Sequence, residues 1–169
     1  ENEHFLHIAN FAIMEKGEFW LCCYASSGMD VHGGVTALTG MPKSIIAMND
    51  LKKAKIPTFA MASRGTSGGT YASSFFMHDF IFVESNSAQD ILFSGKRVTA
   101  NILKGTDQIP EDFGSAAGVM RSGLADITLE NRKKLKDTIT KLANIILKKE
   151  ELEIENADTD SEYFKKTAS

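Results

Sequence analysis

Two short segments of the sequence combine glycine with small hydroxyl residues, in an arrangement suited to holding an oxygen atom of a ligand. They are Ala25-Ser26-Ser27-Gly28 and Thr66-Ser67-Gly68-Gly69. Each follows an apolar run typical of a buried strand and precedes a segment with a helical pattern. Glycine allows the backbone to approach a ligand closely, and loop amides can then hold a phosphate or the oxygen of a thioester enolate. Taken alone, a double glycine is more often a simple turn.

Several other chemistries are not expected from the sequence. Gly68-Gly69 belongs to neither a P-loop nor a dinucleotide-binding fingerprint. Ser27, Ser67 and Ser73 have no evident histidine and acid partners, and we do not expect a nucleophile elbow at Ser67. Four histidines show no metal-ligand spacing, and they are His4, His7, His32 and His78. We therefore expect no metal site.

The composition indicates one globular domain. The chain has 169 residues, a net charge of −3 and 43% hydrophobic residues, so we do not expect a nucleic-acid-binding surface. No apolar run reaches the length of a membrane span, and the first residues lack a signal-peptide pattern. Cys22 and Cys23 are adjacent on an expected strand, and we interpret them as two small buried residues. The low cysteine content fits a reducing compartment.

Apolar runs alternate with helical patterns along the chain, which indicates a layered α/β domain with parallel strands. The expected strands cover residues 19–24, 57–62, 80–84 and 124–127. The expected helices cover residues 5–13, a region up to about 53 that Gly33, Gly34, Gly40 and Pro42 divide, and then 71–77, 97–104, 115–121 and 135–146. Asn2 and Thr128 are candidate caps of the first and last helices. We expect the domain to span 1–150, followed by an acidic, polar tail at 151–169.

The order of these elements places both glycine segments at the carboxyl ends of parallel strands, where α/β folds bind ligands. About forty residues separate them, roughly one strand–helix–strand unit, so we expect both to face one crevice. A basic pair, Lys96-Arg97, lies at the start of another expected helix, where positive charge opposes the helix dipole. Either an acidic neighbour or an anionic ligand would compensate the pair, and simple solvation is the alternative.

The order of the segments resembles the carboxyltransferase β subunit family of bacterial and plastid acetyl-CoA carboxylases. That family carries Ala-Ser-Gly-Gly-Ala-Arg-Met at the place that begins here with Ala25-Ser26-Ser27-Gly28. It carries Thr-Thr-Gly-Gly-Val-x-Ala-Ser at the place of residues 66–73, and Phe-Ala-Gly-x-Arg-Val at the place of residues 93–98. Further matches extend the resemblance from about residue 5 to 147, and they are Asp79, Pro110-Glu111-Asp112-Phe113 and Gly123-Leu124-Ala125-Asp126.

The resemblance implies a crotonase-like α/β fold of repeated ββα units, here partial and without the family's four-cysteine zinc ribbon. It implies an enzyme that moves a carboxyl group from carboxybiotin to acetyl-CoA, forming malonyl-CoA for fatty-acid synthesis. The donor would be carried on a biotin carboxyl carrier protein, the acceptor would be an acyl-CoA, and an α-type carboxyltransferase subunit would complete the site. The family implies no covalently bound cofactor, metal, nucleic acid or membrane, and it places the protein in the cytoplasm or the plastid stroma.

The resemblance also implies roles for individual residues. Backbone amides of Gly28, Gly68 and Gly69 would hold the thioester oxygen as an enolate. The substrate-binding residues would be Ser27, Thr66, Ser67, Lys96 and Arg97. The basic pair among them would lie near the same site or near the partner subunit.

The chain departs from the family pattern at several positions. Ser27 stands in place of a glycine, Asp30 in place of an arginine, and Arg64-Gly65 in place of a segment that is usually Asp-Pro or Ser-Pro. Gly40 and Pro42 fall where the family has a continuous helix. Two alternatives therefore stay open. One is a decarboxylase subunit for malonyl-type thioesters, linked to biotin or independent of it, and the other is a non-catalytic paralogue that only binds a partner.

Overall fold

A parallel β-sheet organises the part of the chain that the computed structural model describes, residues 2–85 and 90–147. Within these residues the strands follow the order β1-β2-β3-β5, and β4 pairs with β2. The strands are β1 (Trp20–Ser26), β2 (Thr58–Ser67), β3 (Phe80–Glu84), β4 (Ile91–Leu92) and β5 (Ile127–Leu129). Every pairing among them is parallel. The expected tail at 151–169 lies outside the described residues.

Helices alternate with the strands, which confirms the predicted α/β class. The helices are α1 (Asn2–Met14), α2 (Gly34–Leu38), α3 (Gly40–Lys53), α4 (Gly68–Ala72), α5 (Lys96–Leu103), α6 (Ala116–Arg121) and α7 (Leu135–Leu147), with 3-10 segments η1 (Val31–Gly33), η2 (Phe75–Met77) and η3 (Arg132–Lys134). None of the described helices is both long enough and apolar enough to cross a bilayer.

Strand β2 is long enough to have two different neighbours on one side. Its first half pairs with β3, and its last two residues, Thr66 and Ser67, pair with β4. On its other side β1 runs along β2 as far as Ser26, which lies beside Thr66. The carboxyl ends of β1, β2 and β4 therefore meet at one end of the sheet, and both glycine segments lie there.

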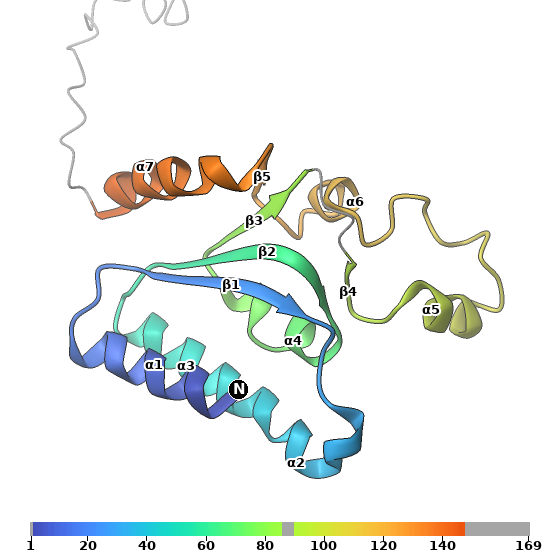
Figure 1. Cartoon of the computed structure of the whole chain (residues 1–169), viewed down its shortest axis with the longest axis horizontal. Coiled ribbons are helices and arrows are strands. Elements are labelled where there is room, and N and C mark those ends of the chain that lie inside the picture. The colour runs from blue at the N-terminus through green and yellow to red at the C-terminus, as the bar shows by residue number, and fades with distance from the viewer. Residues whose placement is uncertain (1, 86–89, 148–169) are drawn as a thin grey trace, which may run out of the picture.

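One face of the sheet is covered by α1, α3 and α4 (Figure 1). Helix α6 packs on the same face through Ala116 and Val119. Trp20 of β1 packs in a cluster with residues of α1 and α3, namely Ala9, Ala47, Met48, Leu51 and Ile56. A second cluster joins the sheet to η2 and α6, and its members are Tyr24, Ala60, Ala62, Phe75, Ile81, Val83, Ile91, Ala116, Val119 and Ala125. Burial of this apolar surface is the main driving force that fixes α4 against the end of β2.

The opposite face is covered by α7, which packs over β2 and β3. Its Ile139 and Ala143 form a buried cluster with Phe59, Met61 and Phe82 of the sheet. The period of apolar residues in α7 is that of a helix with one buried face, as predicted from the sequence.

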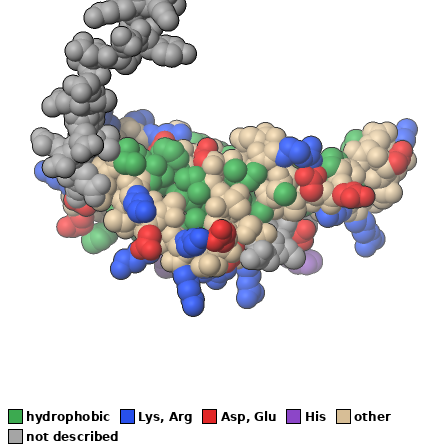
Figure 2. Space-filling view, turned by 90° about the horizontal axis from the view of Figure 1, so that it is seen from above, with side chains coloured by type: hydrophobic (Ala, Val, Ile, Leu, Met, Phe, Trp, Pro, Cys, Tyr) green, Lys and Arg blue, Asp and Glu red, His purple; other side chains and the backbone are tan. Residues whose placement is uncertain are grey.

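Strand β1 is open to solvent on the α7 side. Leu21 is 39% exposed and Phe19, just before the strand, is 40% exposed. Figure 2, seen from this side, shows hydrophobic side chains gathered at the surface. The prediction of a strand buried on both faces is therefore wrong, and so is the interpretation of both cysteines as buried. Cys22 is half-buried, and Cys23, on the open face, is exposed.

Several predicted elements are confirmed within a few residues. They include α1, β3, α5 and α6. The helical region up to 53 is divided as predicted, but the break falls at Thr39, and Gly40 and Pro42 both lie in the first turn of α3. Proline is tolerated there because the first amides of a helix have no partner within the helix.

Other element ends differ from the prediction because long-range pairing decides them. Strand β2 continues to Ser67 rather than ending near residue 62, since β4 supplies a partner that the sequence did not reveal. Helix α4 therefore begins at Gly68 rather than at Tyr71, and it ends at Ala72 because Ser73 has a ψ of −86°.

The last strand lies three residues later than predicted. Gly123 has a φ of +73°, and the Leu124 amide donates to a carbonyl of α6, so these residues still close that helix. Thr128 lies within β5 and caps nothing. The helical segment after it is capped by Asn131, whose side chain accepts a hydrogen bond from the Lys133 amide at 3.0 Å.

Candidate functional site

The two glycine segments are in direct contact, backbone against backbone. Gly28 has a φ of +107° and Gly68 a φ of +59°, a region that L side chains rarely adopt. A Cβ atom on Gly28 would lie 3.1 Å from the Ser67 carbonyl oxygen and 3.2 Å from the Gly68 Cα. A Cβ atom on Gly68 would lie 3.2 Å from the Gly28 Cα. Both positions therefore require glycine, and the structure brings together the two segments that were expected to face one crevice.

Two of the three predicted donor amides are already used inside the protein. The Gly28 amide donates to the Ser26 hydroxyl at 3.2 Å, and that hydroxyl lies 2.9 Å from the hydroxyl of Thr70. The Gly68 amide donates to the Phe93 carbonyl at 3.1 Å. Within the described residues, the Gly69 amide donates no hydrogen bond. Of the three, Gly69 is the one that retains a donor for a ligand.

Gly69 is restricted by side chains rather than by its own backbone. A Cβ atom there would overlap the Cγ of Met29 and would lie 3.4 Å from the Sδ of Met41. Met29 follows Gly28 directly, so the first glycine loop places a thioether side chain against the second. Sequence reasoning missed this contact, because a methionine in a loop carries no signal for the residue that it touches.

The three predicted hydroxyl contacts have different surroundings. Thr66 is fully buried, its amide donates to the Asp90 carbonyl at 3.0 Å, and its hydroxyl donates to the Arg64 carbonyl at 3.3 Å. Thr66 therefore holds the end of β2 in place. Ser67 is half-buried beside the glycine contact, and Ser27 is exposed.

Ser67 also lies at the centre of a sequence pattern of the nucleophile-elbow type, which was not expected. Residues 65–69 match the Gly-x-Ser-x-Gly pattern of a nucleophile elbow. The serine of an elbow sits on a sharp, strained turn, whereas Ser67 has ordinary extended backbone angles, φ −139° and ψ 173°. Within the described residues no histidine bonds to its hydroxyl. The pattern is therefore present at Ser67 without the strained backbone of an elbow.

The basic pair lies at the start of α5, at one end of the molecule (Figure 1). Lys96 and Arg97 are exposed, and within the described residues neither forms an ion pair or a hydrogen bond through its side chain. The segment is tied to the glycine loops through the backbone of Phe93, which accepts the bond from Gly68. The structure thus brings Phe93, rather than the basic side chains, to the glycine contact.

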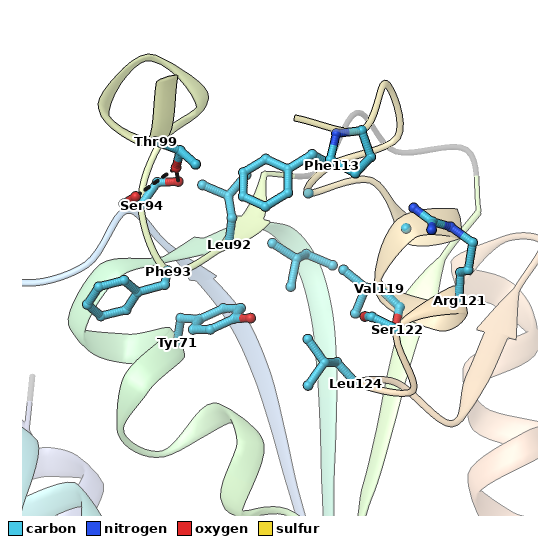
Figure 3. A pocket seen from close by; sticks show the side chains of 14 residues that line it. Tyr71, Leu92, Phe93, Ser94, Thr99, Phe113, Val119, Arg121, Ser122 and Leu124 are labelled. Carbon is cyan, nitrogen blue, oxygen red and sulfur yellow. Dashed lines mark hydrogen bonds between the residues drawn. The ribbon is translucent and has the colours of Figure 1, made fainter. Parts of the chain in front are cut away.

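An apolar cavity of about 500 Å³ adjoins the glycine contact on the α6 side. Figure 3 shows Tyr71, Leu92, Phe93, Phe113 and Leu124 around it. Tyr71 is one turn beyond Gly68 in α4, and Phe93 is the residue that Gly68 bonds to, so the cavity and the second glycine loop share a wall. No residue pattern predicts this cavity, because it forms only where β4 and the loop before α6 meet in the fold.

The polar groups of this cavity lie at its rim. The Ser94 and Thr99 hydroxyls are 2.9 Å apart, as the dashed lines in Figure 3 indicate. Arg121 donates to Asp112 from Nε at 3.0 Å and from Nη2 at 2.6 Å. The guanidinium lowers the pKa of the Asp112 carboxyl below its ordinary value, and Arg121 is therefore held rather than free to bind an anion.

Two aspartates of the matched segments hold the fold rather than a ligand. Asp79 Oδ2 accepts from the amide and the hydroxyl of Thr58, at 2.8 Å and 2.7 Å. Asp126 Oδ2 accepts from the Ile81 amide at 2.8 Å. These bonds fix the starts of β2 and β3. Among the described residues, no group of three or more His, Cys, Asp and Glu side chains is arranged to hold a metal ion.

Comparison with curated proteins finds acetyl-CoA carboxylase carboxyltransferase β subunits. The chain is 32% identical to the subunit of Hyphomonas neptunium over 145 residues, which are 86% of this chain and 43% of that subunit. The chain spans less than half the length of such relatives. No family model matches the chain.

Comparison with solved structures finds the same fold in several enzymes. A Pseudomonas malonate decarboxylase hetero-tetramer in complex with coenzyme A matches with a TM-score of 0.68 and 11% identity, over 88% of this chain and 65% of that one. The transcarboxylase 12S hexamer, with hydrolysed methylmalonyl-coenzyme A bound, matches with a TM-score of 0.63 and 22% identity, over 88% and 27%. Enoyl-CoA hydratases share the fold as well. The chain is thus a crotonase-fold homologue of the acetyl-CoA carboxylase carboxyltransferase β subunits, over about two fifths of their length.

Proposed function

We propose that the chain is the β-type part of a carboxyltransferase that moves a carboxyl group from carboxybiotin to an acyl-CoA such as acetyl-CoA. In this reaction the carbon next to the thioester loses a proton and bonds to the carboxyl carbon. The N–C bond of carboxybiotin breaks, and its nitrogen takes a proton. Negative charge develops on the thioester oxygen as the proton leaves, and one fixed hydrogen-bond donor at that oxygen lowers the barrier by about 3 kcal/mol.

The observation that carries this proposal is the contact between the two glycine loops. It holds the unbonded Gly69 amide beside residues 27–29, whereas Gly28 and Gly68 bond internally. Gly69 would therefore be the donor from the second loop. The Met29 amide, which also donates no hydrogen bond within the described residues, would be the donor from the first. Gly28 and Gly68 would act by letting the loops touch.

The other predicted substrate contacts divide in the same way. Ser27 and Ser67 lie next to the glycine contact and would meet the thioester end of the substrate. Thr66 would act only by holding β2. Lys96 and Arg97 are placed on the exposed start of α5, where they would meet the phosphates of CoA or an α-type subunit. The acceptor's acyl group would extend toward the apolar cavity beside Phe93.

The proposal includes two protein partners. An α-type carboxyltransferase subunit would complete the site, and a biotin carboxyl carrier protein would deliver carboxybiotin, in the cytoplasm or the plastid stroma. The homology supports this assembly, since the matched relatives are named as subunits of acetyl-CoA carboxylase.

Reconstitution tests the proposal. The chain and its co-encoded α-type partner are mixed with malonyl-CoA and biotin, and carboxyl transfer to biotin is followed in the reverse direction. We expect turnover that depends on both chains. It should fall about 100-fold or more in Gly69→Val, because valine keeps the amide but its side chain overlaps Met29 and would move that amide away from the oxygen. Absence of turnover, together with absence of CoA binding by calorimetry, would favour the non-catalytic paralogue.

A second candidate function is decarboxylation of a malonyl-type thioester. The malonate decarboxylase hetero-tetramer shares this fold, and the same donors would hold the enolate that forms when CO2 leaves. Release of CO2 from malonyl-CoA in the absence of biotin would favour this reading over carboxyl transfer.

A further inference from the structure

A second cavity, of about 310 Å³, lies on the α1 and α3 side of the glycine contact. Its walls come from β1, from α4 and the residues that follow it, and from Phe5 and Ser44. Met29 also lines it, and the same side chain touches Gly69. The Ser26 hydroxyl, which accepts the Gly28 amide, is a further lining group. The cavity therefore shares its wall with both glycine loops.

Hydroxyl groups dominate the lining of this cavity. Ser26 and Thr70 bond to each other at 2.9 Å. In contrast, the Ser73 hydroxyl makes no hydrogen bond within the described residues, and the Tyr24 hydroxyl has only the Cys22 thiol and the Ser74 side chain as polar neighbours, neither in hydrogen-bonding geometry. Tyr24 and Ser73 are both more than nine-tenths buried, with exposures of 6% and 4%. We name this space the hydroxyl cavity, after Tyr24, Ser26, Thr70 and Ser73.

The two unpaired hydroxyls are unfavourable for the fold alone. A buried hydroxyl without a partner costs about 1–3 kcal/mol, and phenylalanine or alanine would fill the same space without that cost. The Tyr24 ring is held in place by edge contacts with Phe75 and His78, at centroid distances of 5.2 Å and 5.5 Å. The tyrosine therefore cannot easily turn its hydroxyl elsewhere, and a ligand group is a natural partner for it.

The chemistry of the lining selects a neutral ligand group. None of the described residues that line the cavity carries a charged side chain. Burial raises the pKa of the Cys22 thiol to about 11 and raises that of the Tyr24 hydroxyl further, so both are neutral near pH 7. Hydroxyls both donate and accept hydrogen bonds. The complementary group is one that offers an N–H and a C=O together, which is the chemistry of an amide or a cyclic urea.

We propose that the hydroxyl cavity binds a neutral amide-type group of a substrate, held between Tyr24 on β1 and Ser73 after α4. This inference deepens the proposed function and rests on it for the source of the group. The amides of the pantetheine arm of an acyl-CoA are one source, and the ureido ring of biotin is the other. The shared wall with Gly69 places such a group next to the reacting thioester.

Calorimetric titration of the full chain with pantetheine, and separately with biotin, tests the proposal with the variants Tyr24→Phe and Ser73→Ala. We expect each variant to weaken binding of one of these two probes about tenfold while its melting temperature stays equal to the parent's or rises. The control is Thr138→Ala on α7, which lines neither cavity and whose hydroxyl donates to the Lys134 carbonyl at 2.9 Å. It should leave binding unchanged. Unchanged binding in both Tyr24→Phe and Ser73→Ala, or binding of neither probe, would overturn the proposal.

The two cysteines give a second readout that needs no variant. Both cysteines border the cavity, but the Cys22 side chain is half-buried whereas the Cys23 side chain is exposed, as expected for neighbours on opposite faces of β1. The probe that binds should slow alkylation of Cys22 by iodoacetamide about tenfold and that of Cys23 much less, as read by peptide mass spectrometry. Equal rates for Cys22 with and without a saturating probe would contradict the proposal.

The ligand assignment of the hydroxyl cavity and the proposed carboxyltransferase activity can be tested separately. If the reconstituted enzyme shows no carboxyl transfer but pantetheine or biotin binds in a way that depends on Tyr24 and Ser73, the cavity assignment stands and the catalytic assignment falls. If carboxyl transfer is present and both variants keep parental affinity and KM, the catalytic assignment stands and the hydroxyl cavity is a solvated space only.

Discussion

The glycine contact and the α5 segment carry the two most distinctive sequence matches, yet the fold constrains them in opposite ways. At the glycine contact, Gly28 and Gly68 have no space for a side chain, and backbone atoms surround both. In α5, Val98 and Ile102 are 52% and 70% exposed, and none of its residues is buried. The first region is determined by the chain itself. The second exposes apolar side chains beside a basic pair that has no partner within the described residues.

A residue shared with the family can therefore have one of two causes, which are packing inside the chain and contact with another molecule. A match at Gly28 and Gly68 follows from local packing, so it would persist even in a chain that had lost its activity. A match at Arg97 has no such cause, because its side chain has no partner within the described residues. The α5 segment is thus the better indicator of retained partners, and Gly69 the better indicator of retained chemistry.

The largest effect is expected from Gly68→Ala. Alanine is strained at a φ of +59°, and its Cβ would press on the Gly28 Cα at 3.2 Å. We expect a loss of about 2–4 kcal/mol in the free energy of unfolding, measured by urea denaturation. The matched control is Gly95→Ala before α5, where a Cβ meets no atom within 4 Å. Equal destabilisation by the two variants would remove the contrast between the regions.

Acid should destabilise the fold through His78, a buried residue whose ring lies against that of Tyr24. Burial lowers the pKa of His78 from 6.5 to about 4, although the Phe75 and Ser74 carbonyls bonded to its Nδ1 oppose the shift. The unfolded chain binds a proton near pH 6.5 and the folded chain does not. Stability from this residue is therefore complete above pH 6.5 and decreases by about 3 kcal/mol as the pH falls to 4.

Urea denaturation at several pH values checks this expectation, with His78→Gln as the control. Glutamine does not titrate, so the variant should lose less stability than the parent between pH 6.5 and 4. Parallel pH profiles for the two proteins would show that His78 is solvated in the folded state.

A smaller effect is expected from Gly69→Ala, and a second change should relieve it. The added Cβ overlaps Met29, a flexible side chain, so we expect a cost of about 1–2 kcal/mol. In a Met29→Ala background the same change should cost about 1 kcal/mol less, which a double-mutant cycle measures. Full additivity would mean that Met29 does not lie against Gly69.

The smallest effect on stability is expected from Lys96→Ala and Arg97→Ala. Both side chains are exposed and unpaired within the described residues, so unfolding free energies should stay within about 0.5 kcal/mol of the parent. If the basic pair meets an external anion or subunit, affinity for CoA or for the α-type partner should nevertheless fall about tenfold or more, as measured by calorimetry. Unchanged affinity for both would make the pair a solvated helix end.

The alternation of strands and helices was readable from the sequence because each element carries its own apolar period. The meeting of the two glycine loops was also readable, since parallel strands bring their carboxyl ends together. The departures arise where a distant residue decides the outcome. Strand β4 is only two residues long and exists through its pairing with Thr66 and Ser67, which extends β2 and moves the start of α4.

The site shows the same limit. The glycines predicted the contact between the loops. Which amide lacks an internal acceptor depends on Ser26 and Phe93, and Phe93 lies far from Gly68 in sequence. The exposed face of β1 was missed for a related reason. An apolar strand predicts burial on both sides, whereas α7 packs on β2, β3 and β5 and leaves Leu21 of β1 exposed.

The hydrogen bond that we propose from the Gly69 amide to the thioester oxygen can be observed directly by NMR. The chain with its α-type partner, labelled with 15N-glycine, is titrated with a non-hydrolysable thioether analogue of acetyl-CoA that keeps the carbonyl oxygen. We predict a downfield shift of the Gly69 amide proton as it bonds to that oxygen, with smaller changes at Gly28 and Gly68, whose amides keep their internal acceptors. Saturable binding of the analogue with no change in the chemical shift of the Gly69 amide proton would contradict the role of Gly69 as the donor.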